Sequence, residues 1–124
     1  MAHSMAPDTQ QVRVASGYDV VLVRQHMRQM AREAGFNLPS QARMTAVVSE
    51  IARVALEHHW NAHFTFRLSC HRGWNVIEVQ CSSDSIRRDG NTLAHLTHDV
   101  QALVGDNVLT TNQAAGQLTL RFHT

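Results

Sequence analysis

The sequence predicts an α/β (α+β) two-layer sandwich in which helices pack on one face of a mixed β-sheet. Two long segments carry apolar residues at helical spacing, and a later segment alternates apolar and polar residues around a short turn. A third helical pattern and two more strand-like runs complete the chain. A helix with one apolar stripe has to bury it, so the order strand, two helices, hairpin, helix and hairpin places the helices on the sheet.

Composition is typical of one globular domain. The chain has 124 residues, of which 44% are hydrophobic and 17% charged. Its 11 basic and 10 acidic residues nearly cancel and form no long run of one sign, so binding to nucleic acid or to a membrane surface is not expected. No apolar run approaches the roughly 20 residues of a membrane helix, and no secretion signal opens the chain, which predicts a cytoplasmic protein. We assign residues 1–11 to a polar leader, in part a cloning remnant, and 12–124 to a single domain.

A short strand over residues 12–15 opens the fold at an edge of the sheet, and the Ser-Gly pair after it ends the strand. Asp19 is placed to cap the first helix, Gly35 to stop it, and Phe36 to pack back on its last turn. The apolar face of this helix consists of Val20, Val23, Met27, Met30, Ala31 and Ala34.

The second helix has Ser40 as its expected cap and runs to about His58. Its apolar face consists of Met44, Val47, Val48, Ile51, Ala52 and Ala55. Each of the two helices has one apolar stripe and one face rich in Arg or Glu, which predicts that they lie side by side on the sheet.

An alternating pattern over residues 64–70 and 74–81, around a turn at residues 72–73, predicts a β-hairpin. The register that keeps one face buried pairs Phe64 with Cys81, Phe66 with Val79, and Leu68 with Ile77. This register puts Cys70 and Cys81 on different rungs, so no disulfide is expected. Both are expected on the buried face as packing residues, because buried thiols stay protonated and inert.

Asn91 opens a third helix and Gly105 closes it. Its apolar residues in phase are Leu93, Leu96, Val100 and Leu103. A last pair of strands is expected near residues 108–111 and 117–123.

A family resemblance is carried by four stretches of the chain: residues 18–25, 31–36, 41–45 and 49–53. These stretches match in order and spacing the RsbT-like anti-sigma-factor serine kinases of the GHKL ATPase superfamily, which the chain resembles over residues 12–55. The run Ser-Glu-Ile-Ala-Arg at the end of the second helix is fairly specific to that group. The resemblance implies a histidine-kinase-like ATPase (Bergerat) fold and a bacterial regulator of transcription in the stress response.

In such kinases the Glu of this run is followed four residues later by an Asn on the same helical face. The resemblance implies that the Glu acts as general base or orients water, and that the Asn binds the Mg²⁺ of the triphosphate. Here Glu50 is present, but Val54 stands in place of the Asn and offers no oxygen to a metal.

The later nucleotide elements are altered as well. The family's Asp-x-Gly-x-Gly box corresponds to residues 79–84, which contain no glycine. Gln80 stands where the adenine-reading Asp aligns, with Asp84 as the alternative in a shifted register. Only residues 89–92 remain where a glycine-rich lid normally cradles phosphates, so the ATP lid is shortened.

These changes predict a noncatalytic regulatory protein that needs no cofactor and acts by protein–protein binding in a partner-switching system. A STAS-domain antagonist or another switch regulator is the expected partner. The alternative is a divergent serine-protein kinase that binds Mg-ATP and still uses Glu50. A third interpretation is a homodimer with Val54 and Ala55 in the interface.

For the other notable residues the structural interpretation is favoured. Without a metal partner, Glu50 is expected to pair with an Arg or with water, while Arg53 is left between a structural or partner-contacting role and a solvent-facing one. Trp60 and Trp74 are expected at the ends of the core rather than as exposed anchors. Surface imidazoles are favoured over a metal site for two groups, His58, His59 and His63, and His95, His98 and Asp99.

Overall fold

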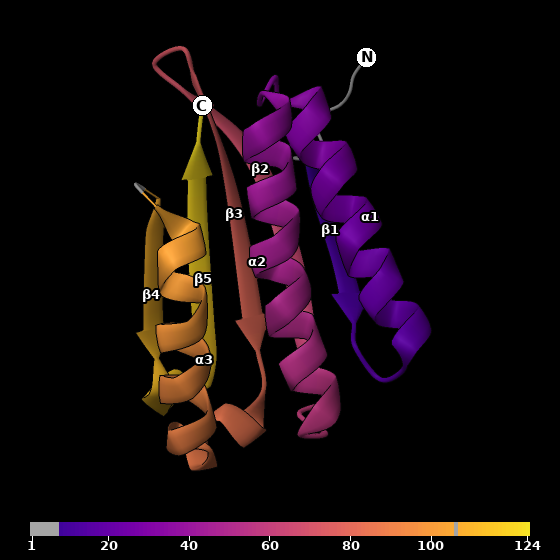
Figure 1. Ribbon diagram of the computed structural model, residues 1–124, viewed down its shortest axis with the longest axis vertical. Helices are drawn as coiled ribbons and strands as arrows, with labels where there is room; N and C mark the ends of the chain where they lie inside the picture. The colour runs from indigo at the N-terminus through magenta and orange to yellow at the C-terminus, as the bar shows by residue number, and fades with distance from the viewer. Residues whose placement is uncertain (1–7, 106) are drawn as a thin grey trace.

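The computed structural model describes residues 8–105 and 107–124, and it confirms the expected order of elements (Figure 1). Two 3₁₀ turns, Asp84–Arg88 and Gln113–Ala115, were not anticipated. The helices and strands are β1 (Asp8–Arg13), α1 (Gly17–Glu33), α2 (Leu38–Glu57), β2 (His63–His71), β3 (Trp74–Ser82), α3 (Gly90–Val104), β4 (Val108–Asn112) and β5 (Gln117–His123). The first strand thus begins four residues earlier than its sequence pattern indicates, because its outer residues are polar.

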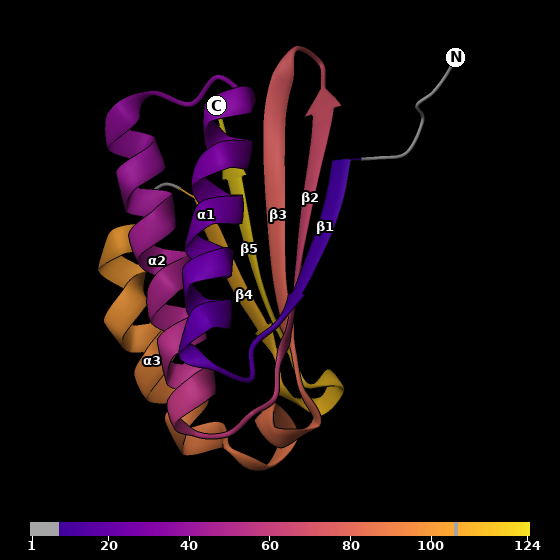
Figure 2. The same ribbon diagram turned by 90° about the vertical axis from the view of Figure 1, so that its right-hand side faces the viewer.

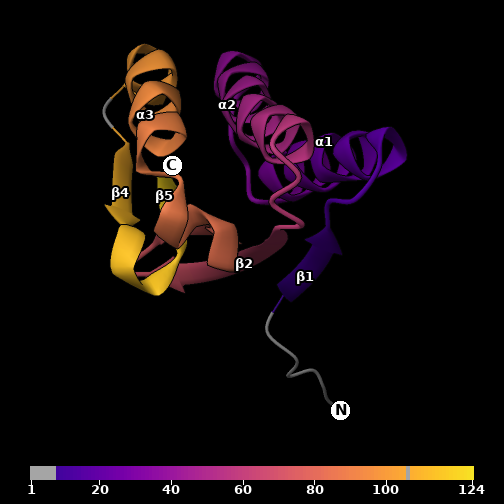
Figure 3. The same cartoon turned by 90° about the horizontal axis from the view of Figure 1, so that it is seen from below.

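The two-layer sandwich is confirmed, with all three helices on one face of a five-stranded sheet (Figures 2 and 3). The strand order is β1-β2-β3-β5-β4, and all four pairings are antiparallel, which corrects the expectation of a mixed sheet. The reason is that β5 inserts between β3 and β4. β3 and β4, which precede and follow α3 in the chain, therefore run in the same direction but are not hydrogen-bonded to each other (Figure 1). Among the described residues, no helix is long and apolar enough to cross a membrane.

Both long helices begin at a cap other than the expected one. Ser16 caps α1 and forms a capping box with Asp19: the Ser16 hydroxyl accepts from the Asp19 N–H, and the Asp19 carboxylate accepts from the Ser16 N–H at 2.9 Å. The Ala15 N–H also donates to Asp19 and is the main cause of a lowered pKa for that carboxyl. Asn37, not Ser40, caps α2, because Pro39 is tolerated in the first helical turn and the helix therefore starts before it.

The two helices end in the same hydrogen-bonded motif with different residues at its left-handed position. After α1, Gly35 has φ 86° and the Phe36 N–H donates to the Ala31 carbonyl at 3.0 Å. After α2, His59 has φ 53° and the Trp60 N–H donates to the Ala55 carbonyl at 2.9 Å. Phe36 and Trp60 are both buried, so an aromatic residue anchors each helix end in the core.

The hairpin of β2 and β3 has the expected register, with Phe64 opposite Cys81. Its turn residues, Arg72 and Gly73, both have positive φ, as a two-residue hairpin turn requires. Cys81 is buried, and burial raises the pKa of its thiol to about 12. Cys70 is exposed, which contradicts the expectation of burial, because it lies near the turn, where the inner face of β2 is no longer buried.

Two further burial expectations are wrong. Trp60 is buried as expected, but Trp74 is 57% exposed, because alternation along β3 from the buried Ile77 and Val79 places it on the face without helices. In the last turn of α3, Val104 is buried in place of Leu103, which is exposed. The remainder of the core is one cluster between the helices and the inner face of β2, β3 and β5.

Candidate functional site

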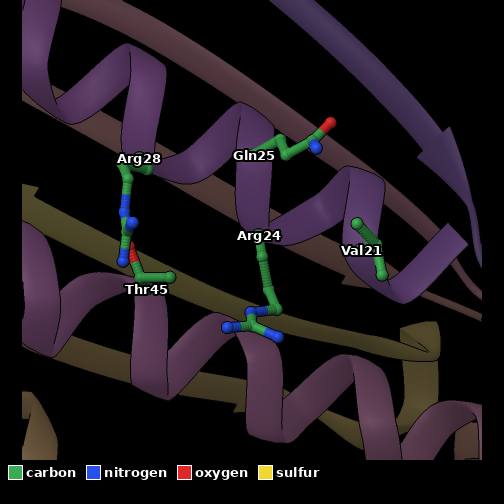
Figure 4. A pocket seen from close by; sticks show the side chains of 5 residues that line it. All are labelled: Val21, Arg24, Gln25, Arg28 and Thr45. Carbon is green, nitrogen blue, oxygen red and sulfur yellow. The ribbon is translucent and has the colours of Figure 1, made fainter. Parts of the chain in front are cut away.

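A groove runs along the outer side of the α1–α2 pair. One cavity, of about 230 Å³, is lined by Val21, Arg24, Gln25, Arg28 and Thr45 (Figure 4). A second, of about 260 Å³, shares Arg24, Arg28 and Thr45 with the first, so the two are continuous. The second cavity adds residues of α2, namely Ala42, Ala46, Ser49, Glu50 and Arg53. We call the combined surface the α1–α2 groove.

Helical spacing creates this groove. Arg24 and Arg28 are one turn apart on α1, so their side chains leave the same face of the helix. Figure 4 shows both side chains reaching from α1 toward α2, with Arg28 beside Thr45. The α2 residues across from them are small, Ala42 and Ala46, and leave the space between the helices unfilled.

The charges of the groove are unevenly paired. Arg53 holds Glu50 with two hydrogen bonds, from Nε at 3.0 Å and from Nη2 at 2.6 Å, and Glu57 with a third at 2.7 Å. These bonds lower the pKa of Glu50 and raise that of Arg53. Within residues 8–105 and 107–124, by contrast, no carboxylate oxygen lies within 4.0 Å of a nitrogen of Arg24 or Arg28.

Val54 lies one turn beyond Glu50 but is only 9% exposed, on the side of α2 that faces α3. Arg43 marks the same side of α2 three turns earlier: a Cβ placed on Gly105, the C-cap of α3, would lie 3.8 Å from its guanidinium. Ala55 is fully buried within this chain. A dimer interface lined by Val54 and Ala55 is therefore wrong, because their own domain covers both.

Gln80 lies on the other side of the sheet. On β3 it alternates with Val79 and Cys81, which face the helices, so its side chain points to the face without helices. Its neighbours on the same rung are Thr65 and Thr119. The structure therefore does not bring Gln80 together with Glu50 and Val54.

The acidic residues after β3 have structural contacts. Asp84 starts the first 3₁₀ turn; its side chain is almost fully exposed, with one oxygen 3.9 Å from Nε of Arg87. Asp89 precedes α3 and accepts a hydrogen bond from the Trp60 indole N–H at 2.9 Å, which lowers the pKa of its carboxyl. Since α3 begins at Gly90, residues 89–92 form the start of a helix rather than a loop.

The histidines do not converge. In the part of the chain that the structure describes, no group of three or more His, Cys, Asp or Glu residues is placed to hold a metal ion. His58 lies with its Nδ1 4.0 Å from Asp89, while His59 and His63 line a separate cavity of about 470 Å³ beside Ser82–Ser85. His95 and His98 are exposed on α3.

Arg24 and Arg28 were not singled out from the sequence beyond the statement that the helix has an Arg-rich face. A signal was present: Arg24, Arg28 and Arg32 are spaced four apart, and no acidic residue stands three or four positions from the first two. The placement of α2 across from them, which makes a groove, is a tertiary feature that this spacing does not contain.

No family model matches the chain. The serine/threonine-protein kinase RsbT of Bacillus subtilis (strain 168) is 45% identical to it over 42 residues, which make up 34% of this chain and 32% of the kinase. The chain thus matches about a third of the length of that relative. An RsbT-like relationship within this segment is what the similarity supports.

Proposed function

We propose that the chain is a noncatalytic regulatory protein related to the anti-sigma-factor serine kinases, and that it acts by binding another protein in a partner-switching system. The observation that carries the proposal is Val54. A metal-dependent phosphoryl transfer needs an oxygen ligand there, and the position holds a hydrocarbon side chain packed toward α3.

The surroundings of Glu50 support the same conclusion. A general base has to accept a proton from the attacking group, so its carboxylate has to be available to that group. Both Glu50 oxygens accept hydrogen bonds from Arg53. The arrangement has the properties of a surface ion pair, with Arg53 in a structural role, rather than those of a catalytic carboxylate.

The α1–α2 groove is the surface that we assign to the partner. It combines exposed charged groups with small residues along two packed helices, so it offers both charge and shape to another protein. A STAS-domain antagonist or another switch regulator is the partner class implied by the relationship to the kinase. A homodimer through other surfaces is tested by light scattering, which would show a mass of one chain if no dimer forms.

A second candidate function is a divergent serine-protein kinase that uses Mg-ATP and Glu50. Two observations favour it: the similar protein is a serine/threonine-protein kinase, and Glu50 borders a cavity. This candidate requires that the metal be held without an amide or carboxylate at Val54.

Isothermal titration with Mg-ATP separates the two candidates. We expect no binding at micromolar nucleotide, and a micromolar dissociation constant would remove the noncatalytic part of the proposal. Transfer of radiolabel from ATP to a candidate STAS antagonist is the second assay. Transfer by the wild type that is lost in Glu50→Ala would establish the kinase instead.

A further inference from the structure

We propose that the α1–α2 groove recognises an acidic segment of the partner, with Arg24 and Arg28 each binding one carboxylate. The inference rests on the proposed function, because it assumes that this face meets a protein. It adds the chemical identity of the segment and the two residues that select it.

The first argument is charge. Like charges one turn apart destabilise a helix, and α1 carries three arginines in such a row, Arg24, Arg28 and Arg32. The chain as a whole has a formal net charge of only +1, so the row is a local concentration and not a general basic character. An acidic partner would relieve this repulsion in the complex.

The second argument comes from Arg53, which belongs to the same groove. Its guanidinium binds the Glu50 carboxylate through two parallel hydrogen bonds, the geometry that Arg and carboxylates prefer. Arg24 and Arg28 carry the same group into the groove, and among the described residues no carboxylate pairs with them. In the groove, one guanidinium group, that of Arg53, therefore binds a carboxylate of the chain itself, and those of Arg24 and Arg28 are available to carboxylates of a partner.

The third argument is space. The groove is floored by Thr45 and by the methyl groups of Ala42 and Ala46, which leave room for an incoming side chain beside each arginine. Val21, 43% exposed at one end of the groove, adds an apolar contact. Because Arg24 and Arg28 are about 6 Å apart along the axis of α1, a helix with two acidic residues one turn apart fits both.

A protein segment fits the groove better than a nucleic acid. A polyanion needs a continuous basic track, and here the Glu50 carboxylate lines the same cavity as Arg24 and Arg28. A protein segment carries its negative charges on separate side chains, which can be spaced to match the two guanidinium groups.

The test uses an alanine-based helical peptide of about 20 residues with two glutamates four positions apart as the probe. Proton–nitrogen NMR spectra of the full chain are followed during titration at low salt. We expect saturable shifts of the Arg24 and Arg28 side-chain N–H signals and of the α2 residues that line the groove. A second peptide with phosphoserine in place of glutamate tells whether phosphoryl groups serve as well as carboxylates.

Three comparisons decide the outcome. The double variant Arg24→Gln/Arg28→Gln should bind the glutamate peptide about tenfold more weakly or worse. Arg32→Gln, the same charge change in the next turn of α1 but outside the groove, should stay within about twofold of wild type. A matched peptide with glutamine in place of glutamate should leave the spectra unchanged.

The inference is overturned by an absence of saturable shifts, by equal binding of the double variant, or by equal binding of a single-stranded oligothymidine. Its failure is distinct from that of the proposed function. If a STAS-domain antagonist binds wild type and the Arg24→Gln/Arg28→Gln variant equally well, the groove is wrong and the binding function stands. If Mg-ATP binds at micromolar concentration, the noncatalytic function fails whatever the peptide does.

Discussion

The two long sides of α2 meet different neighbours in different ways. Toward α1, small and polar residues leave the α1–α2 groove open, and Arg24 and Arg28 reach into it. Toward α3, Val54 is packed away from solvent, and at the end of the helix Trp60 donates its indole N–H to Asp89, the residue that precedes α3. One side of the same helix is open and charged, and the other is closed and apolar.

The difference bears directly on function. The resemblance to the kinases puts a metal ligand at Val54, which is on the closed side. A bound triphosphate and cation need a polar cavity, whereas a protein partner needs an accessible surface. The open side offers such a surface, so the contrast supports binding rather than catalysis. Four substitutions test the contrast.

Trp60→Ala should have the largest effect on stability, because it removes the buried side chain that joins the end of α2 to the residue before α3. Trp60 is 2% exposed, so its removal leaves a cavity and also takes the hydrogen-bond donor from Asp89. We expect the free energy of unfolding in urea to fall by about 3–5 kcal/mol. Trp74→Ala is the control, and a change of about 0.5 kcal/mol or less is expected there. Equal losses at both positions would contradict the burial of Trp60.

Val54→Asn introduces the Asn that the related kinases have at this position. It tests whether the side of α2 that faces α3 tolerates a polar group. We expect a loss of about 2 kcal/mol in the free energy of unfolding, since a polar group enters an apolar contact. Val21→Asn makes the same change on the exposed side of α1 and should alter stability by about 0.5 kcal/mol or less. Calorimetry of the variant with Mg-ATP should remain flat; micromolar binding would mean that a nucleotide site persists beside α2.

Asp89→Asn probes the contact between Trp60 and α3 through pH. The indole N–H lowers the pKa of Asp89 from its usual value of 3.8, so the ionised contact stabilises the fold above that value. Its contribution is lost as the pH falls through the lowered pKa of the folded state. We expect the variant to lose about 0.5–1 kcal/mol at pH 6 and to differ less from wild type at pH 3 in urea titrations. Asp99→Asn, at an exposed position of α3, is the control and should change the stability at pH 6 by about 0.5 kcal/mol or less.

Glu50→Gln should have the smallest effect on stability, because it removes a partly exposed ion pair on the open side. A change of about 0.5 kcal/mol or less in thermal or urea unfolding is expected. The lowered pKa of Glu50 gives the sign of the pH dependence: any stabilisation is present at neutral pH and is lost in acid. A loss above about 2 kcal/mol would indicate that Glu50 and Arg53 act as a buried pair.

Local patterns predicted most of the fold. The register of β2 and β3 followed from the two-residue turn at residues 72–73 together with alternation, since pairing across that turn keeps Phe64, Val79 and their neighbours on one face. The caps of α1 and α2 were misplaced by three residues each, because Ser16 and Asn37 compete with other capping residues within the same turn. Alternation also failed at Cys70, since it says which face a residue takes and not how far the helices extend over it.

The candidate site was harder to predict. Glu50 and its partner Arg53 are a local pair that helical spacing reveals. The groove depends on how α1 and α2 pack against each other. Ala42 and Ala46 form a groove only because Arg24 and Arg28 lie across from them, and the sequence does not show that placement. The position of Gln80 was not predictable for a similar reason: the motif places it at the end of a strand, but only the fold shows that it lies on the face of the sheet without helices, away from Glu50 and Val54.

The two cysteines differ in exposure, so their reaction with a thiol reagent can report how often the core opens. Cys70 meets solvent in the native state, whereas Cys81 is shielded in the core and its thiol ionises only at high pH. A thiol reagent therefore modifies the first at once and reaches the second only during excursions that separate the hairpin from the helices. The ratio of the two modification rates measures how often that happens, with no label added to the chain.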